Sequence, residues 1–261
     1  MNEGVATSPA PVLELAHVSA AYGPFRALFD VDLVVADGEA VALLGANGAG
    51  KTTVARVASG LLAPGSGTVR VGGQDVTGAL PHRFVRAGVA HAPEGRSVFS
   101  TLTTEENLTL SFRRSQGRAG VRAALDRAYE LFPVLGERRR QLAGTLSGGQ
   151  QRMLSMARVL VESPSLLVAD ELSLGLAPKI VDEVYAGLAR LREHGTSLLI
   201  VEQQVRHALD LCDRAVVLHH GAVAWSGSAE EAAERAASDI FDQAAPVAQD
   251  EGVVGQTSRR T

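Results

Sequence analysis

The chain has 261 residues, a hydrophobic content of 46% and a formal net charge of −4. A chain of this length buries roughly 70% of its unfolded surface, so it needs no disulfide or metal to hold a core. The negative charge argues against general nucleic-acid binding, which requires clustered Lys and Arg, and the lone Cys212 fits a reducing compartment.

The N-terminal residues 1–4 have neither a basic flank nor an apolar core, so they do not resemble a signal peptide. No apolar run along the chain approaches the ~18 residues that a membrane-spanning helix requires. The sequence therefore predicts a chain that stays in the cytoplasm unless a partner recruits it to a membrane.

Strands dominate the N-terminal third. Runs with β-branched residues, separated by Gly and Asp turns, predict strands at 13–20, 28–35 and Ala40–Leu44, followed by a strand at 68–71. We expect these four segments to form an antiparallel sheet beside a parallel core.

A glycine-rich segment, Gly-Ala-Asn-Gly-Ala-Gly-Lys-Thr, lies between the buried strand at 39–44 and a predicted helix at 52–58. In this P-loop pattern, backbone N–H groups surround a phosphate, Lys51 adds a positive charge, and the Thr52 hydroxyl holds Mg²⁺. A simple Gly-rich turn is the alternative. The predicted ATP-binding residues are Gly45, Ala46, Asn47, Gly48, Ala49, Gly50, Lys51, Thr52 and Thr53.

Helices predominate from about Val85 to Val161, which we interpret as a helical subdomain inserted in the core. Thr103 and Glu106 have the spacing of a capping box at the start of one helix. A second phrase, Leu-Ser-Gly-Gly-Gln, precedes a helix at 150–162; small residues and a helix N-terminus together favour an anion site, and an ordinary N-capped helix is the alternative. This site would consist of Ser147, Gly148, Gly149 and Gln150.

The third phrase is a buried strand at 166–169 that ends in Asp170 and Glu171. Open α/β sheets bind ligands at the carboxyl ends of their strands. We predict that Glu171 orients or deprotonates an attacking water, a step that typically contributes 10²–10⁴-fold to the rate. A salt bridge at the strand edge is the alternative.

The core resumes with a helix after Pro178 and strands at Ser197–Val201 and 214–218. This alternation predicts an α/β fold with a single domain over residues 1–241. The aperiodic Ala/Gln/Gly/Ser-rich segment 242–261 predicts a disordered tail.

These three phrases together resemble the nucleotide-binding cassettes of ATP-binding-cassette (ABC) transporters over about residues 13–237. The resemblance implies a P-loop NTPase cassette with a parallel-sheet RecA-like core, an antiparallel β subdomain and an α-helical signature subdomain. It implies that Tyr22 stacks on adenine, that Thr52 and Asp170 hold Mg²⁺, and that residues 147–150 contact ATP bound to a second cassette. Mere packing is the alternative for Tyr22.

Three positions depart from the commonest family pattern. Glu94 occupies the usual glutamine position, where it is a further candidate Mg²⁺ ligand; Gln203 replaces the switch histidine, and Ser-Leu-Gly-Leu-Ala-Pro occupies 173–178. This trio is similar to one of the two ATPase subunits of branched-chain amino-acid importers. Leu172 stands where that subfamily usually has proline, which changes the stiffness of the loop.

The resemblance implies a set of partners and a location. We expect a second ABC ATPase subunit in a heterodimer, two membrane permease subunits and an extracytoplasmic substrate-binding protein, with no nucleic acid. The chain would lie on the cytoplasmic face of the inner membrane. The loop 94–99 would couple to the membrane partner, with Val98 and Phe99 either as anchors or as core residues.

Several alternatives stay open at this stage. A urea or amide importer ATPase is similar but commonly retains Gln at position 94. A soluble ABC ATPase of DNA repair or translation usually carries insertions, paired cassettes or basic elements that this sequence lacks. A P-loop kinase or GTPase would have no role for the Leu-Ser-Gly-Gly-Gln phrase.

Overall fold

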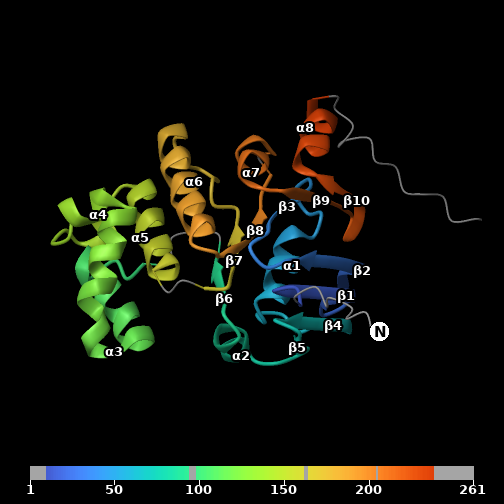
Figure 1. The fold of residues 1–261 in the computed structure, drawn as a ribbon, viewed down its shortest axis with the longest axis horizontal. Coiled ribbons are helices and arrows are strands. Elements are labelled where there is room, and N and C mark those ends of the chain that lie inside the picture. The colour runs from blue at the N-terminus through green and yellow to red at the C-terminus, as the bar shows by residue number, and fades with distance from the viewer. Residues whose placement is uncertain (1–9, 94–97, 162–163, 204, 238–261) are drawn as a thin grey trace, which may run out of the picture.

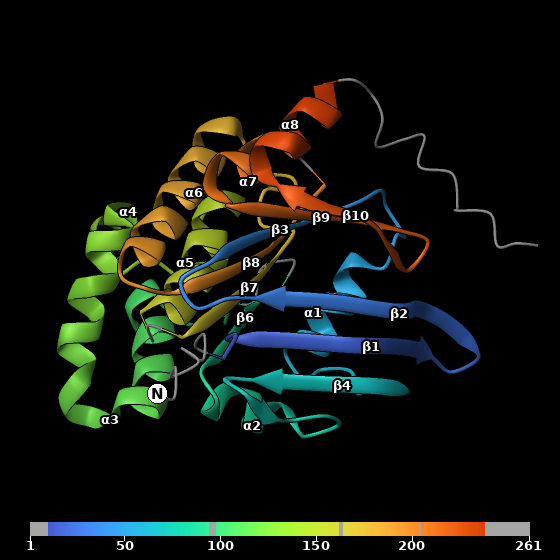
Figure 2. The ribbon, with the colours of Figure 1, turned by 45° about the vertical axis from the view of Figure 1, so that its right-hand side comes forward.

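The computed structural model describes residues 10–93, 98–161, 164–203 and 205–237, which form two sheets and the helices around them (Figure 1). The smaller sheet is antiparallel, with the strand order β2-β1-β4-β5. Its strands are β1 (Leu13–Tyr22), β2 (Phe25–Val35), β4 (Ser66–Val71) and β5 (Gln74–Asp75). Figure 2 shows β1, β2 and β4 side by side.

The larger sheet has the strand order β10-β9-β3-β8-β7-β6. Its neighbours pair in parallel except β10, which is antiparallel to β9. The strands are β3 (Ala40–Leu44), β6 (Val89–Ala92), β7 (Leu166–Asp170), β8 (Ser197–Val201), β9 (Arg214–His219) and β10 (Ala222–Ser228). The predicted parallel core is therefore present.

Two sequence-based placements are wrong. The strand Ala40–Leu44 lies in the parallel sheet between β8 and β9, and does not belong to the antiparallel sheet. All five of its residues are buried, as expected of a strand covered on both faces. The helical stretch also begins later than Val85–Val161 predicts, because β6 pairs with β7 inside the parallel sheet.

Helices cover the larger sheet and extend to one side of it. They are α1 (Lys51–Ala58), α2 (Pro81–Arg86), α3 (Thr104–Leu131), α4 (Pro133–Glu137), α5 (Gly148–Leu160), α6 (Pro178–Glu193), α7 (Val205–Leu211) and α8 (Ala229–Ala237), with a 3₁₀ turn at Ala143–Thr145. Figures 1 and 2 show α3, α4 and α5 together at one end of the molecule. The predicted capping box at Thr103 and Glu106 is confirmed at the start of α3.

Strand β3 divides two hydrophobic cores. Ala40, Ala42 and Leu44 face the core that contains α5 and α6, whereas Val41 and Leu43 face the core that contains α1 and the antiparallel sheet. Successive residues of a strand point to opposite faces, so one short apolar strand contributes to both cores. This burial fixes the position of the loop that follows β3.

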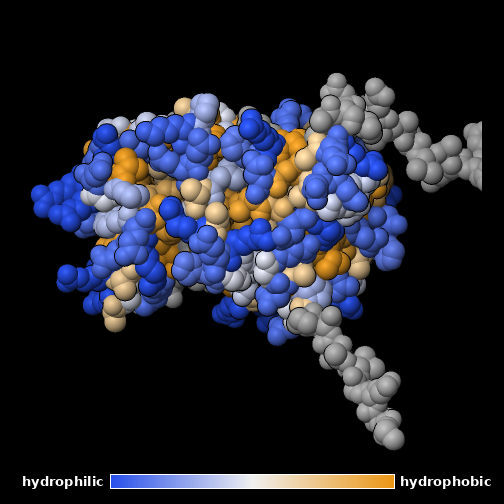
Figure 3. Space-filling model, turned by 45° about the horizontal axis from the view of Figure 1, so that its top comes forward, coloured by the Kyte–Doolittle hydropathy of each residue, from blue (hydrophilic) through white to orange (hydrophobic). Residues whose placement is uncertain are grey.

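None of the helices in the described part of the chain has both the length and the apolar character to cross a membrane. The face drawn in Figure 3 is largely hydrophilic, with hydrophobic side chains scattered between the charged ones. The predicted disordered tail, residues 242–261, lies outside the described residues.

Candidate functional site

The loop between β3 and α1 depends on glycine at specific positions. Gly48 and Gly50 have φ values of 79° and 103°, and a Cβ on Gly45 would lie 2.5 Å from the carbonyl oxygen of Leu218. A Cβ on Gly50 would lie 3.0 Å from the carbonyl oxygen of Ala27. Left-handed turns of this kind build concave anion sites from backbone N–H groups.

Lys51, the first residue of α1, is 3% exposed and surrounded by oxygens. Its Nζ donates hydrogen bonds to the carbonyls of Gly45 at 2.9 Å and Ala46 at 3.2 Å. Oε1 of Glu171 lies 3.7 Å from the same Nζ. The ammonium group is therefore held between the glycine-rich loop and the end of β7.

Thr52 and Asp170 meet across the site. The Thr52 hydroxyl donates to Oδ1 of Asp170 at 3.3 Å, and Asp170, the last residue of β7, is buried. A hydroxyl and a carboxylate are hard oxygen donors of the kind that Mg²⁺ prefers. In the part of the chain that the structure describes, no group of three or more His, Cys, Asp or Glu side chains is placed to hold a metal ion. Thr52 and Asp170 would supply two of the ligands of a Mg²⁺ ion, which in nucleotide sites usually keeps water and phosphate oxygens as the others.

Glu171 has an unusual backbone. Its φ is 46°, in the left-handed region that residues other than glycine rarely adopt, and its N–H donates to the carbonyl of Val201 at 2.8 Å. Its side chain is 16% exposed. Such conformations cost of order 1–3 kcal/mol and cluster at functional sites. This observation supports the hypothesis that Glu171 has a functional role.

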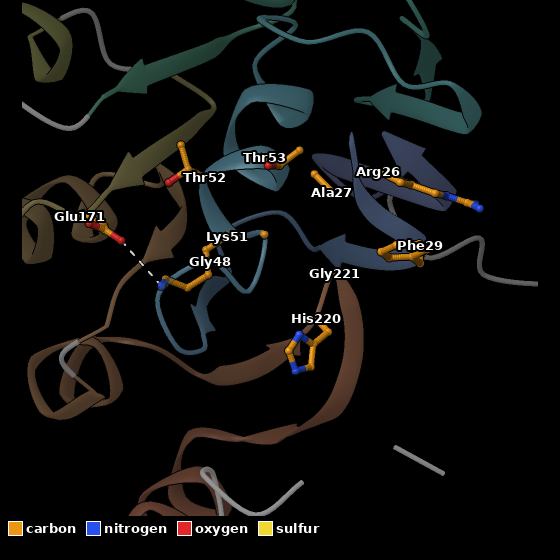
Figure 4. Close-up of a pocket in the computed structure, with 11 residues that line it drawn as sticks. Arg26, Ala27, Phe29, Gly48, Lys51, Thr52, Thr53, Glu171, His220 and Gly221 are labelled. Atoms are coloured by element: carbon orange, nitrogen blue, oxygen red, sulfur yellow. Dashed lines mark ion pairs between the residues drawn. The ribbon is translucent and has the colours of Figure 1, made fainter. Parts of the chain in front are cut away.

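A cavity of about 570 Å³ opens beside the glycine-rich loop (Figure 4). The structure brings together at this cavity five predicted ATP-binding residues and the predicted catalytic acid: Gly48, Gly50, Lys51, Thr52, Thr53 and Glu171. Figure 4 shows Lys51 and Glu171 directed toward each other at one side of the cavity. The rest of its lining comes from β2 and from the turn between β9 and β10.

Sequence reasoning missed the lining residues Arg26, Ala27, Phe29, His220 and Gly221. Gly221 joins them to the loop, since its N–H donates to the carbonyl of Ala49 at 2.9 Å and its carbonyl accepts from the N–H of Phe29 at 2.8 Å. No local motif marks these residues. His220 and Gly221 reach the cavity because β9 lies beside β3, and Phe29 on β2 is joined to them by its hydrogen bond to Gly221.

Tyr22 lies at the end of β1 and is 40% exposed. Its hydroxyl accepts a hydrogen bond from Nη1 of Arg56 at 3.1 Å, and it is not among the described residues that line the cavity. Among the described lining residues, Phe29 and His220 carry aromatic rings. The stacking of Tyr22 on adenine stays a prediction.

The Leu-Ser-Gly-Gly-Gln phrase forms the start of α5. Ser147 is the N-cap: its Oγ accepts from the N–H of Gln150 at 3.3 Å, and Oε1 of Gln150 accepts from the N–H of Ser147 at 3.0 Å. A Cβ on Gly149 would lie 2.8 Å from Ile180 of α6, so close packing requires glycine there. Residues 147–150 are not among the described residues that line the cavity.

Arg152, on the same helix, is a second residue that sequence reasoning missed. It is buried, and Nη2 donates to the carbonyls of Asp170 and Glu171, both at 3.2 Å, while Nη1 donates to the carbonyl of Pro93 at 2.7 Å. The helix that begins at Ser147 is therefore tied directly to the end of β7. In the sequence, only the position of Arg152, five residues beyond Ser147, could have indicated this role.

The remaining predicted residues are distributed around the site. Gln203 is exposed after β8 and is not among the described lining residues, and Glu94 lies outside the described residues. Val98 is half-buried and packs against the core, whereas Phe99 is 48% exposed with the guanidinium of Arg158 5.3 Å from its ring centre.

Residues 28–173 match the family model described as ABC transporter. The chain is 42% identical to the high-affinity branched-chain amino acid transport ATP-binding protein BraG of Pseudomonas aeruginosa, covering 81% of this chain and 91% of that protein. It is 33% identical to BraF of the same organism, with coverage of 85% and 93%.

Two further matches are informative. A probable branched-chain amino acid transport ATP-binding protein LivF of Archaeoglobus fulgidus is 35% identical, covering 85% of this chain and 94% of that protein. Among solved structures, an ATP-binding subunit of an ABC transporter superimposes with a TM-score of 0.78 at 26% identity, covering 89% of this chain and 99% of the other.

Proposed function

This chain belongs to the ABC transporter family, and from that membership we propose that it energises an importer of branched-chain amino acids. As a cassette of this family it is an ATPase that binds ATP and hydrolyses it. The observation that carries the choice of cargo is the 42% identity over 81% of the chain with a branched-chain amino acid transport ATP-binding protein.

The proposed chemistry follows the geometry at the P-loop. Backbone N–H groups of residues 45–50 and the ammonium of Lys51 bind the β- and γ-phosphates, and Thr52 with Asp170 would hold Mg²⁺. A bound Mg²⁺ supplies charge neutralisation on the phosphate oxygens. Glu171 orients the attacking water and accepts its proton, a role supported by its place beside Lys51 at the cavity.

Gln203 has a more limited role than the histidine it replaces. Its amide donates and accepts hydrogen bonds toward a γ-phosphate or a water, but it cannot become a cation. We therefore expect weaker charge stabilisation at this site and a reliance on the partner cassette. Slower ATP turnover in a Gln203→His chain within the assembled transporter would contradict this. Glu94 keeps its proposed place as a further Mg²⁺ ligand.

The signature residues Ser147, Gly148, Gly149 and Gln150 are proposed to contact ATP on a second cassette. Their separation from the chain's own cavity lining supports this. BraG and BraF are two different branched-chain amino acid transport ATP-binding proteins of one organism, and both match this chain. We infer a heterodimer of cassettes, joined to two permease subunits on the cytoplasmic face of the membrane and served by an extracytoplasmic binding protein.

Uptake measurements test the cargo. Cells that carry only a Lys51→Ala chain should lose uptake of labelled leucine and keep uptake of labelled urea. The matched control is Lys179→Ala, the same change at an exposed lysine on α6, which should preserve both. Loss of urea uptake alone would transfer the assignment to a urea importer, and unchanged uptake of both would contradict the proposed transport role.

A further inference from the structure

The segment that follows Glu171 is anchored to the end of β8. Its first anchor is the hydrogen bond from the N–H of Glu171 to the carbonyl of Val201, at 2.8 Å. The segment then turns, with the N–H of Leu176 donating to the carbonyl of Ser173 at 3.2 Å, and Leu174 at the turn is 55% exposed. A second anchor holds Ser173 itself.

That second anchor is the carboxylate of Glu202. Oε1 of Glu202 accepts from the N–H of Ser173 at 3.0 Å, and Oε2 accepts from the Ser173 hydroxyl at 2.9 Å. The two residues are 2% and 3% exposed. The N–H of Glu202 donates to the carbonyl of Leu43 at 3.1 Å, so the carboxylate is fixed to the strand that leads into the P-loop.

A buried carboxylate in this place is costly. None of the ion pairs between described residues includes Glu202. Burial, together with the negative charge of Glu202, raises the pKa of the neighbouring Tyr185. Because a buried charge without a cation is less favourable than a well-packed apolar side chain, a gain in stability does not account for Glu202. What Glu202 provides instead is a fixed position for Ser173, through two hydrogen bonds.

The geometry lies next to the proposed chemistry. Ser173 is two residues from Glu171, whose left-handed backbone persists only when the surrounding structure restrains it. The hydrogen bond to the carbonyl of Val201 restrains Glu171 directly. The hydrogen bonds from Ser173 to Glu202 restrain the chain just after it. Leu172 between them is buried in the hydrophobic core, which holds the same short segment from a third side.

We propose that Glu202 is a positioning residue for ATP hydrolysis, which holds Ser173 and thereby fixes Glu171 relative to Lys51. Glu202 also precedes Gln203, so one carboxylate links the positions of both residues proposed to act on the attacking water. The inference rests on the proposed role of Glu171 and does not depend on the cargo.

The experiment compares kcat and KM for ATP in full-length chains assembled with the partner cassette. Glu202→Ala should lower kcat about 10- to 100-fold with KM within about twofold, since small misplacements of a catalytic group have effects of this size. Glu202→Gln should retain most of the activity, because its amide accepts from the Ser173 N–H and donates to the hydroxyl. Ser173→Ala should have an intermediate kcat, and the double variant should be no slower than Glu202→Ala.

Two further variants separate the possible causes. Glu39→Ala removes a carboxylate that pairs with Arg214 at 2.9 Å, just before the opposite end of β3, and should keep the wild-type kcat. Glu171→Gln tests the proposed role of Glu171: wild-type turnover there would contradict that role, whereas an inactive Glu171→Gln beside a fully active Glu202→Ala would contradict only the positioning role.

Other results also decide the question. An equal loss of kcat in Glu39→Ala and Glu202→Ala would overturn the proposal, because the loss would then follow general destabilisation. Additive effects of Ser173→Ala and Glu202→Ala on kcat would overturn it as well. If Glu202→Ala does not fold, Ser173→Ala carries the test, and an unchanged kcat in that chain would refute the inference.

Discussion

The P-loop region and the signature region of this chain are built in opposite ways. At the P-loop, Lys51, Thr52 and Glu171 converge on a cavity of about 570 Å³. At the signature, Ser147 and Gln150 satisfy each other in a capping box and lie outside the described lining of that cavity. Among the described residues, the P-loop residues therefore face a cavity within their own chain, whereas the signature residues form no part of that cavity.

The two regions are nevertheless joined. Arg152 extends from the signature helix to the carbonyls of Asp170 and Glu171 at the P-loop cavity. A displacement of α5 would therefore act on the backbone that carries the proposed catalytic acid. Substitutions that change one region at a time show which steps, ATP binding or hydrolysis, depend on each region.

The largest expected effect is that of Glu171→Gln. Turnover of ATP should fall by about 10²–10⁴-fold, because the amide cannot accept a proton from the attacking water. ATP affinity should stay within a few-fold, which fluorescence titration with an ATP analogue would measure. Glu193→Gln, the same change at an exposed residue that ends α6, is the control and should be fully active. Normal turnover in Glu171→Gln would remove this residue from the mechanism.

Lys51→Ala should affect binding itself. The loss of a charged hydrogen-bonding group from the P-loop should weaken ATP affinity by about 10- to 100-fold, which corresponds to about 1.4–2.7 kcal/mol. Equilibrium binding on the isolated chain measures this, with Lys179→Ala as the control. An affinity within twofold of wild type would mean that the P-loop region does not bind the phosphates as proposed.

A pH titration tests the packing of His91 against the end of α1, the helix that begins at the P-loop. His91 lies on β6, its Nδ1 is 3.3 Å from the hydroxyl of Ser59 just after α1, and burial, with a smaller effect of Arg56, lowers its pKa to about 4. In the unfolded chain, His91 binds a proton near pH 6.5, whereas in the folded chain it does so only near pH 4. The neutral His91 therefore contributes to the free energy of unfolding above pH 6.5, and this contribution is lost as pH falls toward 4.

The wild type should therefore lose about 2 kcal/mol more unfolding free energy than His91→Gln between pH 7 and pH 5. Urea unfolding at pH 7, 6 and 5 measures the difference. Parallel pH dependences of the two chains would contradict the assignment of this effect to His91.

The smallest effect is expected from Ser147→Ala. Loss of the N-cap should lower the stability by about 1 kcal/mol and leave ATP affinity of the isolated chain unchanged. Thr103→Ala, which removes the N-cap and capping box of α3, is the matched control for stability. A clear loss of ATP affinity in Ser147→Ala alone would show that the signature acts on the nucleotide of its own chain.

Candidate site residues that stand next to one another in the chain can be recognised from the sequence. The P-loop and the pair Asp170 and Glu171 were predicted because each lies in a short pattern with its own chemistry. Phe29 and His220 were not. His220 reaches the cavity through the pairing of β9 with β3, and Phe29 contacts the turn after β9, far from it in the chain, through its hydrogen bond to Gly221. The same reason explains the misplacement of Ala40–Leu44, whose sheet partners β8 and β9 lie more than 150 residues later.

The most direct test of the account is the mass of the Glu171→Gln chain in solution with the second cassette subunit of its transporter. Size-exclusion chromatography with light scattering would be run with and without Mg-ATP. The account predicts a two-cassette complex that forms with Mg-ATP and is lost when Ser147→Arg is added. A chain that binds ATP yet keeps the mass of a single cassette in every mixture would contradict it.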